Sequence, residues 1–250
     1  MSSDLDPARA LFRISGDDRI DFLQGLVSND LKRLADGLVY AAFLSPQGKY
    51  LADFFLLEDG DGLILDVAEP LAAGLIQRLN MYKLRADVSI TPLDAKVTRG
   101  LGDVPEGALA DPRHSDLGWR CFNGSCPDQS VDWPDLRVKL GIPESGIELI
   151  PNDSYILEME FERLCGVDFR KGCYVGQEVT ARMHHKTTLK KGLRRIRIKG
   201  QAPIGTEITS GGKPAGKLFT QSNGEALAYL RFDRIGPEMK AAEATLTPAE

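Results

Sequence analysis

The chain has 250 residues, 42% of them hydrophobic and 27% charged, which is the composition of an ordinary soluble globular protein with two or three packed units. Its formal net charge of −5 argues against a general nucleic-acid binder, because such proteins carry a positive surplus that neutralises phosphates. No apolar run is long enough to cross a bilayer, so we expect no membrane association.

The N-terminal half alternates short strands with helices. A strand is expected at residues 10–14, followed by two short helices that share an apolar stripe and end at Gly37. The segment from residue 50 to residue 90 has the element order strand, strand, helix, strand, which is half of a ferredoxin-like unit. Residues 96–100 and 119–122 are expected to supply the rest. The strands are predicted at residues 39–44, 50–57, 63–67 and 88–90, and the helix at residues 70–84.

The C-terminal half begins with helices and ends with strands. Asp132 followed by tryptophan and proline is typical of a helix start and predicts a helix to residue 140. A second helix is expected over residues 156–164. Beyond Gly192 short alternating strands are separated by glycine turns, which indicates a small antiparallel barrel or sandwich. The predicted fold class is therefore α+β.

The most unusual stretch is KGCYVGQEVTARMHHK, residues 171–186. Taken alone, the stretch has a structural interpretation. Lys171 would be a surface charge, and Cys173 a small buried hydrophobic residue between two glycines that form turns. The functional reading is that Arg170 and Lys171 lower the pKa of the Cys173 thiol toward the reactive thiolate. A helix that starts at Gly176 would add unpaired amides that favour an anion at the same place.

Four blocks of the sequence, in the same order, resemble the YgfZ-type folate-binding proteins. This family is related to the glycine-cleavage aminomethyltransferase (T-protein) and includes mitochondrial iron–sulfur cluster assembly factors. Its signature K-G-C-Y-x-G-Q-E is met at residues 171–178, and a following A-R-x-H at residues 181–184. The other blocks are DRIDFLQGLVSNDL at residues 18–31, SPQGKYLADFFL at residues 45–56 and LRVKLGIPESGIELIP at residues 136–151.

The resemblance implies a three-lobed T-protein-like fold around a central hole, with a ferredoxin-like unit and a small C-terminal antiparallel β-barrel. Tetrahydrofolate, or a one-carbon derivative of it, would sit in the hole. The expected lobes are an N-terminal folate-binding lobe of residues 1–48 plus 131–186, a ferredoxin-like lobe of residues 49–130 and a barrel lobe of residues 187–250.

The resemblance also suggests site residues. Cys173 and Lys171 are the predicted catalytic residues. Asp53 would accept a hydrogen bond from the pterin or serve only as a strand-end acid, and Asn29 would contact the ligand or cap a helix. Arg182 would meet the glutamyl carboxylates of folate. No metal site is predicted, and the predicted folate-contacting residues are Asn29, Asp53, Tyr174, Gln177, Glu178 and Arg182.

Lysine stands at residue 139, where the glycine-cleavage enzyme has a glutamate that contacts the pterin. A cation in place of an acceptor carboxylate changes the hydrogen-bond chemistry of the site, so we expect no glycine-cleavage activity. The expected function is that of a tetrahydrofolate-binding accessory protein for assembly or repair of iron–sulfur cluster proteins, and through them for tRNA modification. The alternatives are a folate-dependent aminomethyl or one-carbon transferase and a scaffold that has lost its ligand.

The four cysteines are expected to be reduced thiols of a cytoplasmic protein, because the N-terminus lacks the features of a secretory signal. Cys121 and Cys126 have a spacing that could hold a metal only with partners elsewhere. A lone Cys173 cannot hold a stable iron–sulfur cluster, which typically takes four cysteines, so a partner would share any metal bound there. We expect a monomer whose partners are folate and iron–sulfur client or assembly proteins, with no direct contact to nucleic acid.

Overall fold

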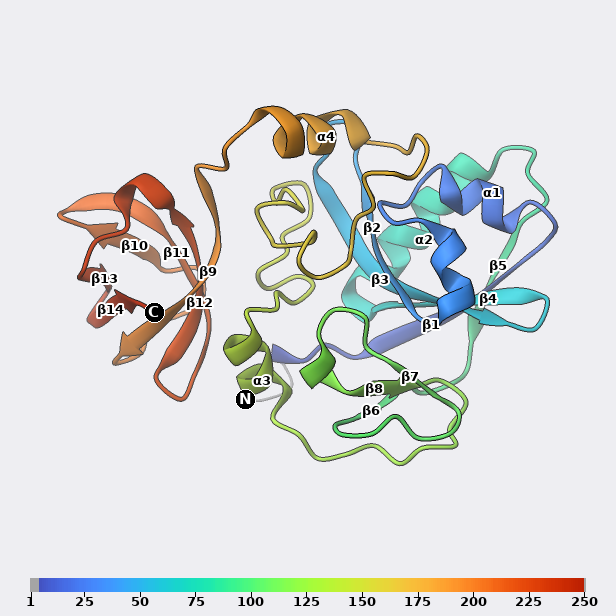
Figure 1. The fold of residues 1–250 in the computed structure, drawn as a ribbon, viewed down its shortest axis with the longest axis horizontal. Coiled ribbons are helices and arrows are strands. Elements are labelled where there is room, and N and C mark those ends of the chain that lie inside the picture. The colour runs from blue at the N-terminus through green and yellow to red at the C-terminus, as the bar shows by residue number, and fades with distance from the viewer. Residues whose placement is uncertain (1–4, 250) are drawn as a thin grey trace.

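The structure, a computed structural model, describes residues 5–249. Figure 1 shows a closed barrel at one end of the molecule and a five-stranded sheet at the other, with an irregular segment between them. A single helix, α4 (Gln177–Lys186), crosses above that segment and leads into the barrel. Across the described residues, no helix combines the length and the apolar character needed to span a bilayer.

The five-stranded sheet is antiparallel and has the order β2-β3-β4-β1-β5. Its strands and helices from β1 to β5, with β2 left aside, follow the β-α-β-β-α-β order of a ferredoxin-like unit. Two helices and a 3-10 helix accompany it. The elements are β1 (Arg9–Ser15), α1 (Arg19–Gln24), η2 (Leu31–Asp36), β2 (Val39–Leu44), β3 (Tyr50–Asp59), β4 (Gly62–Ala68), α2 (Glu69–Lys83) and β5 (Ser89–Leu93).

Two expectations about this unit need correction. The strand that completes the unit is β1, from the N-terminus, which lies between β4 and β5, whereas residues 96–100 and 119–122 were expected to supply the rest of the unit. The expected lobe boundary between residues 48 and 49 falls inside the sheet, because β2 and β3 pair across it. A strand pattern reveals that a segment is extended but carries little information about which distant segment it pairs with.

Residues 98–121 instead form a small separate sheet with the order β6-β8-β7. It lies below the large sheet in Figure 1. The two layers are joined by ion pairs, since the Arg120 guanidinium of β8 lies 3.4 Å from a carboxylate oxygen of Asp66 on β4. Its elements are β6 (Thr98–Gly100), β7 (Ala108–Ala110), η3 (Ser115–Leu117) and β8 (Trp119–Cys121).

The C-terminal strands close into a six-stranded antiparallel barrel, which confirms the barrel prediction. The strand order around the barrel is β10-β11-β12-β9-β14-β13, and pairing of β13 with β10 closes it. Buried Ile196, Leu218, Leu230 and Leu246 fill its interior. The elements are β9 (Lys191–Lys199), β10 (Glu207–Ser210), β11 (Lys213–Ser222), β12 (Glu225–Arg231), η4 (Phe232–Arg234), β13 (Met239–Ala241) and β14 (Ala244–Pro248).

The central segment begins with α3 (Trp133–Leu140), whose prediction is confirmed. Asp132 accepts the Asp135 N–H at the start, and Gly141 ends the helix in the left-handed region. The helix predicted over residues 156–164 is wrong, because these residues form successive turns. Glu160 has a φ of +65°, which a right-handed helix does not contain.

Candidate functional site

The loop before α4 is pinned by segments that are far apart in the sequence. The Lys171 ammonium donates to the carbonyl oxygens of Gln24 at 2.8 Å, Asn29 at 3.0 Å and Val27. Just beyond the thiol, the Val175 N–H donates to the Gly25 carbonyl at 3.1 Å. These bonds hold the loop on both sides of Cys173 against the end of α1.

A second contact fixes the C-terminal end of the loop. Gly176 has a φ of +83°, and a side chain there would lie 2.4 Å from the Ser45 carbonyl oxygen. Gly48, in the facing Ser-Pro-Gln-Gly turn, has a φ of +75°, and a side chain there would lie 2.8 Å from the Val179 side chain of α4. Both positions therefore require glycine. Three of the sequence blocks quoted above thus converge on one loop.

The Cys173 side chain is exposed on this pinned loop. Cys165, which precedes the loop, is exposed as well. Tyr174 is buried next to it, and burial raises the pKa of its hydroxyl to about 12. The Gln177 side-chain oxygen accepts the Tyr174 N–H at 3.3 Å. The loop therefore buries a tyrosine and presents a thiol to solvent.

Lys171 lies differently from the expectation that it activates the thiol. Its ammonium is directed at three carbonyl oxygens and stands 4.9 Å from the centre of the Tyr174 ring. Burial lowers the pKa of Lys171 to about 8, with Asp30 and Asp168 opposing that effect. The geometry gives Lys171 a positioning role for the Cys173 loop.

Glu178 and Arg182 lie on the outer side of α4 and are exposed. With Lys186 they line an open hollow of about 430 Å³ on the surface of the helix. His184 stacks on Phe169, with ring centres 3.8 Å apart, and is bonded to Glu162. The structure therefore brings Tyr174, Gln177, Glu178 and Arg182 to the same loop and helix as Cys173.

The other two predicted folate contacts are buried and bonded within the protein. The Asp53 carboxylate accepts hydrogen bonds from the hydroxyls of Tyr40 at 2.9 Å, Tyr50 at 2.5 Å and Ser145 at 2.6 Å. Burial and the Asp53 charge raise the pKa of both tyrosines well above the ordinary value. The Asn29 amide donates to the Tyr40 carbonyl at 2.8 Å, and the helix cap expected at Asn29 is supplied by its neighbour instead.

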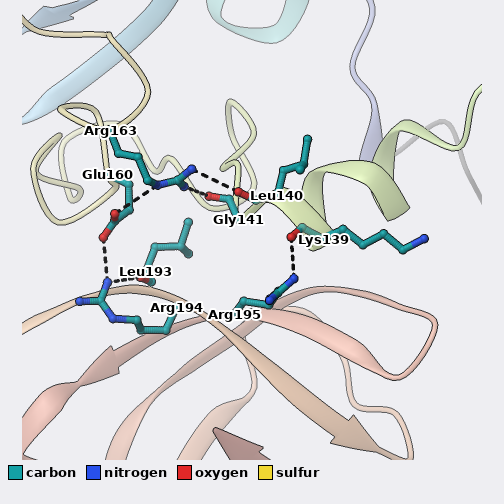
Figure 2. A pocket seen from close by; sticks show the side chains of 8 residues that line it. All are labelled: Lys139, Leu140, Gly141, Glu160, Arg163, Leu193, Arg194 and Arg195. Atoms are coloured by element: carbon teal, nitrogen blue, oxygen red, sulfur yellow. Dashed lines mark hydrogen bonds and ion pairs between the residues drawn. The ribbon is translucent and has the colours of Figure 1, made fainter. Parts of the chain in front are cut away.

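Lys139 does not point toward the centre of the molecule. Its ammonium pairs with Asp135 one turn earlier at 2.7 Å, and its side chain is 55% exposed. In the hollow of about 260 Å³ beside it, Arg163 donates to the carbonyl of Gly141 at 2.6 Å and Arg195 to that of Lys139 at 2.7 Å (Figure 2). These arginines satisfy the carbonyl end of α3, so the hollow is a junction between helix and barrel.

A larger cavity of about 390 Å³ lies between the barrel and the central segment. Its apolar wall includes the buried Met159 and Phe219. Tyr229 also lines it and donates its hydroxyl to the buried Glu158 carboxylate at 2.5 Å, and burial followed by this bond raises the pKa of Tyr229. Four cations border the same cavity: Lys191, Lys217, Arg231 and Arg234.

A buried ion cluster, which the sequence analysis missed, joins the two sheets. Asp111 accepts from Arg113 at 2.8 Å and from Arg120 at 2.9 Å, and all three side chains are at least 94% buried. Both guanidinium groups also face the Phe55 ring, at 4.9 and 4.1 Å from its centre. Asp111 and Arg113 follow β7 in a loop and Arg120 lies on β8, and charged residues in such places ordinarily face solvent.

Within residues 5–249 no group of three or more His, Cys, Asp or Glu side chains is placed to hold a metal ion.

Comparison with known proteins places this architecture in a family. The chain is 30% identical over 288 residues to the mouse mitochondrial iron–sulfur cluster assembly factor IBA57, covering 95% of this chain and 80% of the mouse protein. The chain belongs to the IBA57 family. It is also 30% identical to human IBA57 over 282 residues, with 94% and 79% of the two chains covered. The IBA57 homologue of Mycosarcoma maydis is 33% identical over 218 residues, which cover 74% of this chain and 54% of that protein.

Two further comparisons concern the IBA57-family fold. Residues 190–250 match the model of the C-terminal beta-barrel domain of CAF17. The crystal structure of the glycine cleavage system aminomethyltransferase T from Bartonella henselae superposes with a TM-score of 0.74, covering 97% of this chain and 83% of that one. At 12% identity this likeness establishes the fold, and it confirms the predicted T-protein-like architecture.

The expected cytoplasmic location is wrong. The IBA57 relatives of mouse, human and Mycosarcoma maydis are all named as mitochondrial proteins. The expectation rested on the absence of a secretory signal, and that absence does not distinguish among compartments inside the cell.

Replacing Lys171 with methionine tests the positioning role in this IBA57-family chain. Lys171→Met keeps the length of the side chain but leaves three carbonyl oxygens without their charged donor. We expect a loss of about 2 kcal/mol in the free energy of unfolding, measured by urea titration. Lys186→Met, at an exposed lysine on α4, is the matched control and should leave the urea midpoint unchanged. Equal midpoints for the two variants would contradict the role given to Lys171.

Proposed function

We propose that this protein is a folate-binding accessory factor of the YgfZ type that acts in the assembly or repair of iron–sulfur cluster proteins. Cys173 supplies the thiol that takes part in this step. The observation that carries the proposal is the exposed position of Cys173 on a loop that Lys171 and Val175 pin on both sides. Membership of a family whose relatives are named iron–sulfur cluster assembly factors supports it.

The chemistry of the thiol follows from its setting. A thiolate is a soft ligand that suits iron and sulfur species, and an exposed one is open to a protein partner. Because one cysteine is too few for a stable cluster, the partner protein would supply the remaining ligands. The pinned loop would keep the sulfur in place while the partner docks. An effect on tRNA modification would then be indirect, through an iron–sulfur enzyme that this step serves.

The cavity between barrel and central segment is the proposed folate site. Reduced folate is a flat heterocycle that continues into an aromatic ring and a tail with carboxylates. Met159 and Phe219 offer an apolar wall for the rings, with Tyr229 beside them. The cations at the rim, among them Lys217 and Arg231, suit the carboxylates of the tail. This site replaces Asn29 and Asp53 as predicted contacts, because their polar groups are bonded within the protein.

Folate binding is expected to raise the melting temperature. A ligand that binds only the folded state stabilises it by about 2.7 kcal/mol at a hundredfold excess over its Kd. Tetrahydrofolate should therefore give a saturable thermal shift. Lys217→Glu, at the cavity rim, should weaken binding about tenfold, or about 1.4 kcal/mol.

Lys213→Glu is the matched control, since Lys213 is an exposed lysine of the same strand and does not line the cavity. It should bind like the wild type. No thermal shift at any attainable tetrahydrofolate concentration would reject the folate part of the proposal. It would leave the thiol part standing, because that part rests on Cys173. If both variants weakened tetrahydrofolate binding equally, the proposal that folate binds in this cavity would be rejected.

A further inference from the structure

Two thiols lie together in the small sheet of β6, β7 and β8, away from the Cys173 loop to which the function is assigned. Cys121 ends β8, and Cys126 follows after a four-residue loop. Their relative exposures are 0% and 4%. With Trp119 they form a small cluster of their own, separate from the larger cores. In Figure 1 this sheet lies at the bottom, and the chain before α4 that carries Cys173 at the top.

The two sulfur atoms share one neighbour. The Ser125 hydroxyl oxygen is 3.5 Å from the Cys121 sulfur and 3.5 Å from the Cys126 sulfur. The sulfurs are therefore separated by no more than twice that distance. Side-chain rotation and the displacement of one hydroxyl would bring them toward bonding distance, which is about 2.05 Å.

The backbone supports the same proximity. Thr98 on β6 is the register partner of Cys121 on β8. The Thr98 hydroxyl also donates to the Cys126 carbonyl at 2.8 Å. Both cysteines are thus held beside the same residue. A bond between them would close only the loop of residues 121–126.

The chemistry of Cys121 favours oxidation. Burial alone would raise the pKa of its thiol, but hydrogen bonds with Ser125, Cys126 and the backbone lower the pKa to about 7. This shift favours the thiolate, which is the reactive form. Cys121 itself is 0% exposed, but Asn123 and Ser125, which contact its sulfur, lie in an exposed loop, so a displacement of that loop would open a short path for a small oxidant.

We propose that Cys121 and Cys126 are a dithiol that a hydroperoxide oxidises to an intramolecular disulfide. The Cys121 thiolate attacks hydrogen peroxide, the O–O bond breaks, and a sulfenic acid forms with release of hydroxide. The Cys126 thiol then attacks that sulfur, and the S–S bond forms as water leaves. The proton lost when Cys121 ionised converts hydroxide to water. In total two thiols lose two electrons and two protons, and one peroxide becomes two waters.

The test uses the full chain at neutral pH with one equivalent of hydrogen peroxide, followed by iodoacetamide and trypsin without reduction. Cleavage after Arg120 and Arg137 leaves both cysteines in the single peptide of residues 121–137. We expect that peptide to gain no alkyl group and to lack two hydrogens. Dithiothreitol before alkylation should restore two alkylation sites.

Cys126→Ser should abolish the bridge and leave Cys121 alkylated or oxidised further. Cys165→Ser is the control, because Cys165 is exposed and lies outside the cluster, and it should keep the bridge. The proposal is overturned if wild-type peptide 121–137 stays doubly alkylated while Cys173 is oxidised, or if the bridge forms only in urea. The wild-type peptide map decides this even if a variant does not fold.

Discussion

Cys173→Ser should fold and bind tetrahydrofolate like the wild type, yet fail to support iron–sulfur enzyme activity in cells that lack the native protein. The side chain is exposed, so the substitution removes no packing. The loop is held by Lys171 and Val175, whose bonds do not involve the thiol. Serine has nearly the same size but is a poor ligand for iron or sulfane sulfur.

The measurement is the activity of an iron–sulfur enzyme in complemented cells, together with the melting temperature of each purified protein. Cys165→Ser is the matched control, because Cys165 is the other exposed thiol and should complement fully. Iodoacetamide should also modify Cys173 faster than the buried Cys121 and Cys126. Complementation by Cys173→Ser at the wild-type level, with normal protein abundance, would reject the proposed role of this thiol.

Asp111→Ala should cost about 3–5 kcal/mol of stability, the largest effect expected from a single substitution here. Asp111 is the carboxylate between Arg113 and Arg120. Removing it takes away the ion-pair partner of the buried Arg113 guanidinium and leaves Arg120 with Asp66, 3.4 Å away. Chemical denaturation measures the loss. Asp233→Ala is the control, since Asp233 pairs with Arg231 in solvent and should leave the unfolding midpoint unchanged.

The Asp111 carboxylate also makes the stability of the protein depend on pH. Burial alone would raise the pKa of Asp111, but Arg113 and Arg120 outweigh burial and hold it well below its ordinary value. A depressed pKa in the folded state contributes stability that is complete above the unfolded pKa of about 3.9 and is lost as pH falls through the folded pKa. Stability of Asp111→Ala should therefore decline less steeply below about pH 4 than that of the wild type. Parallel profiles would show that Asp111 is not ionised in the folded protein.

Several local features could be predicted from the sequence because their causes are local. Asp132, the proline after it and Gly141 define α3 at both ends, since capping and backbone preferences act within a few residues. The alternation beyond Gly192 predicted barrel strands, since the side chains of a strand alternate between two faces. The Lys171–Glu178 motif predicted a functional loop, but the contact of its lysine with three backbone carbonyl oxygens could not be predicted from it.

Other features were decided only by the tertiary structure. The insertion of β1 between β4 and β5 depends on pairing between segments that are about fifty or more residues apart, which no local pattern specifies. The role of Lys171 became visible only with the carbonyl oxygens of Gln24 and Asn29, some 140 residues earlier in the chain, beside it. Burial of Asp111 between two arginines likewise reversed the usual expectation that charged residues of a loop face solvent. In each case the free energy of a side chain is set by neighbours that folding brings from distant parts of the chain, and a charge is stable in the interior only when those neighbours include its counter-charge.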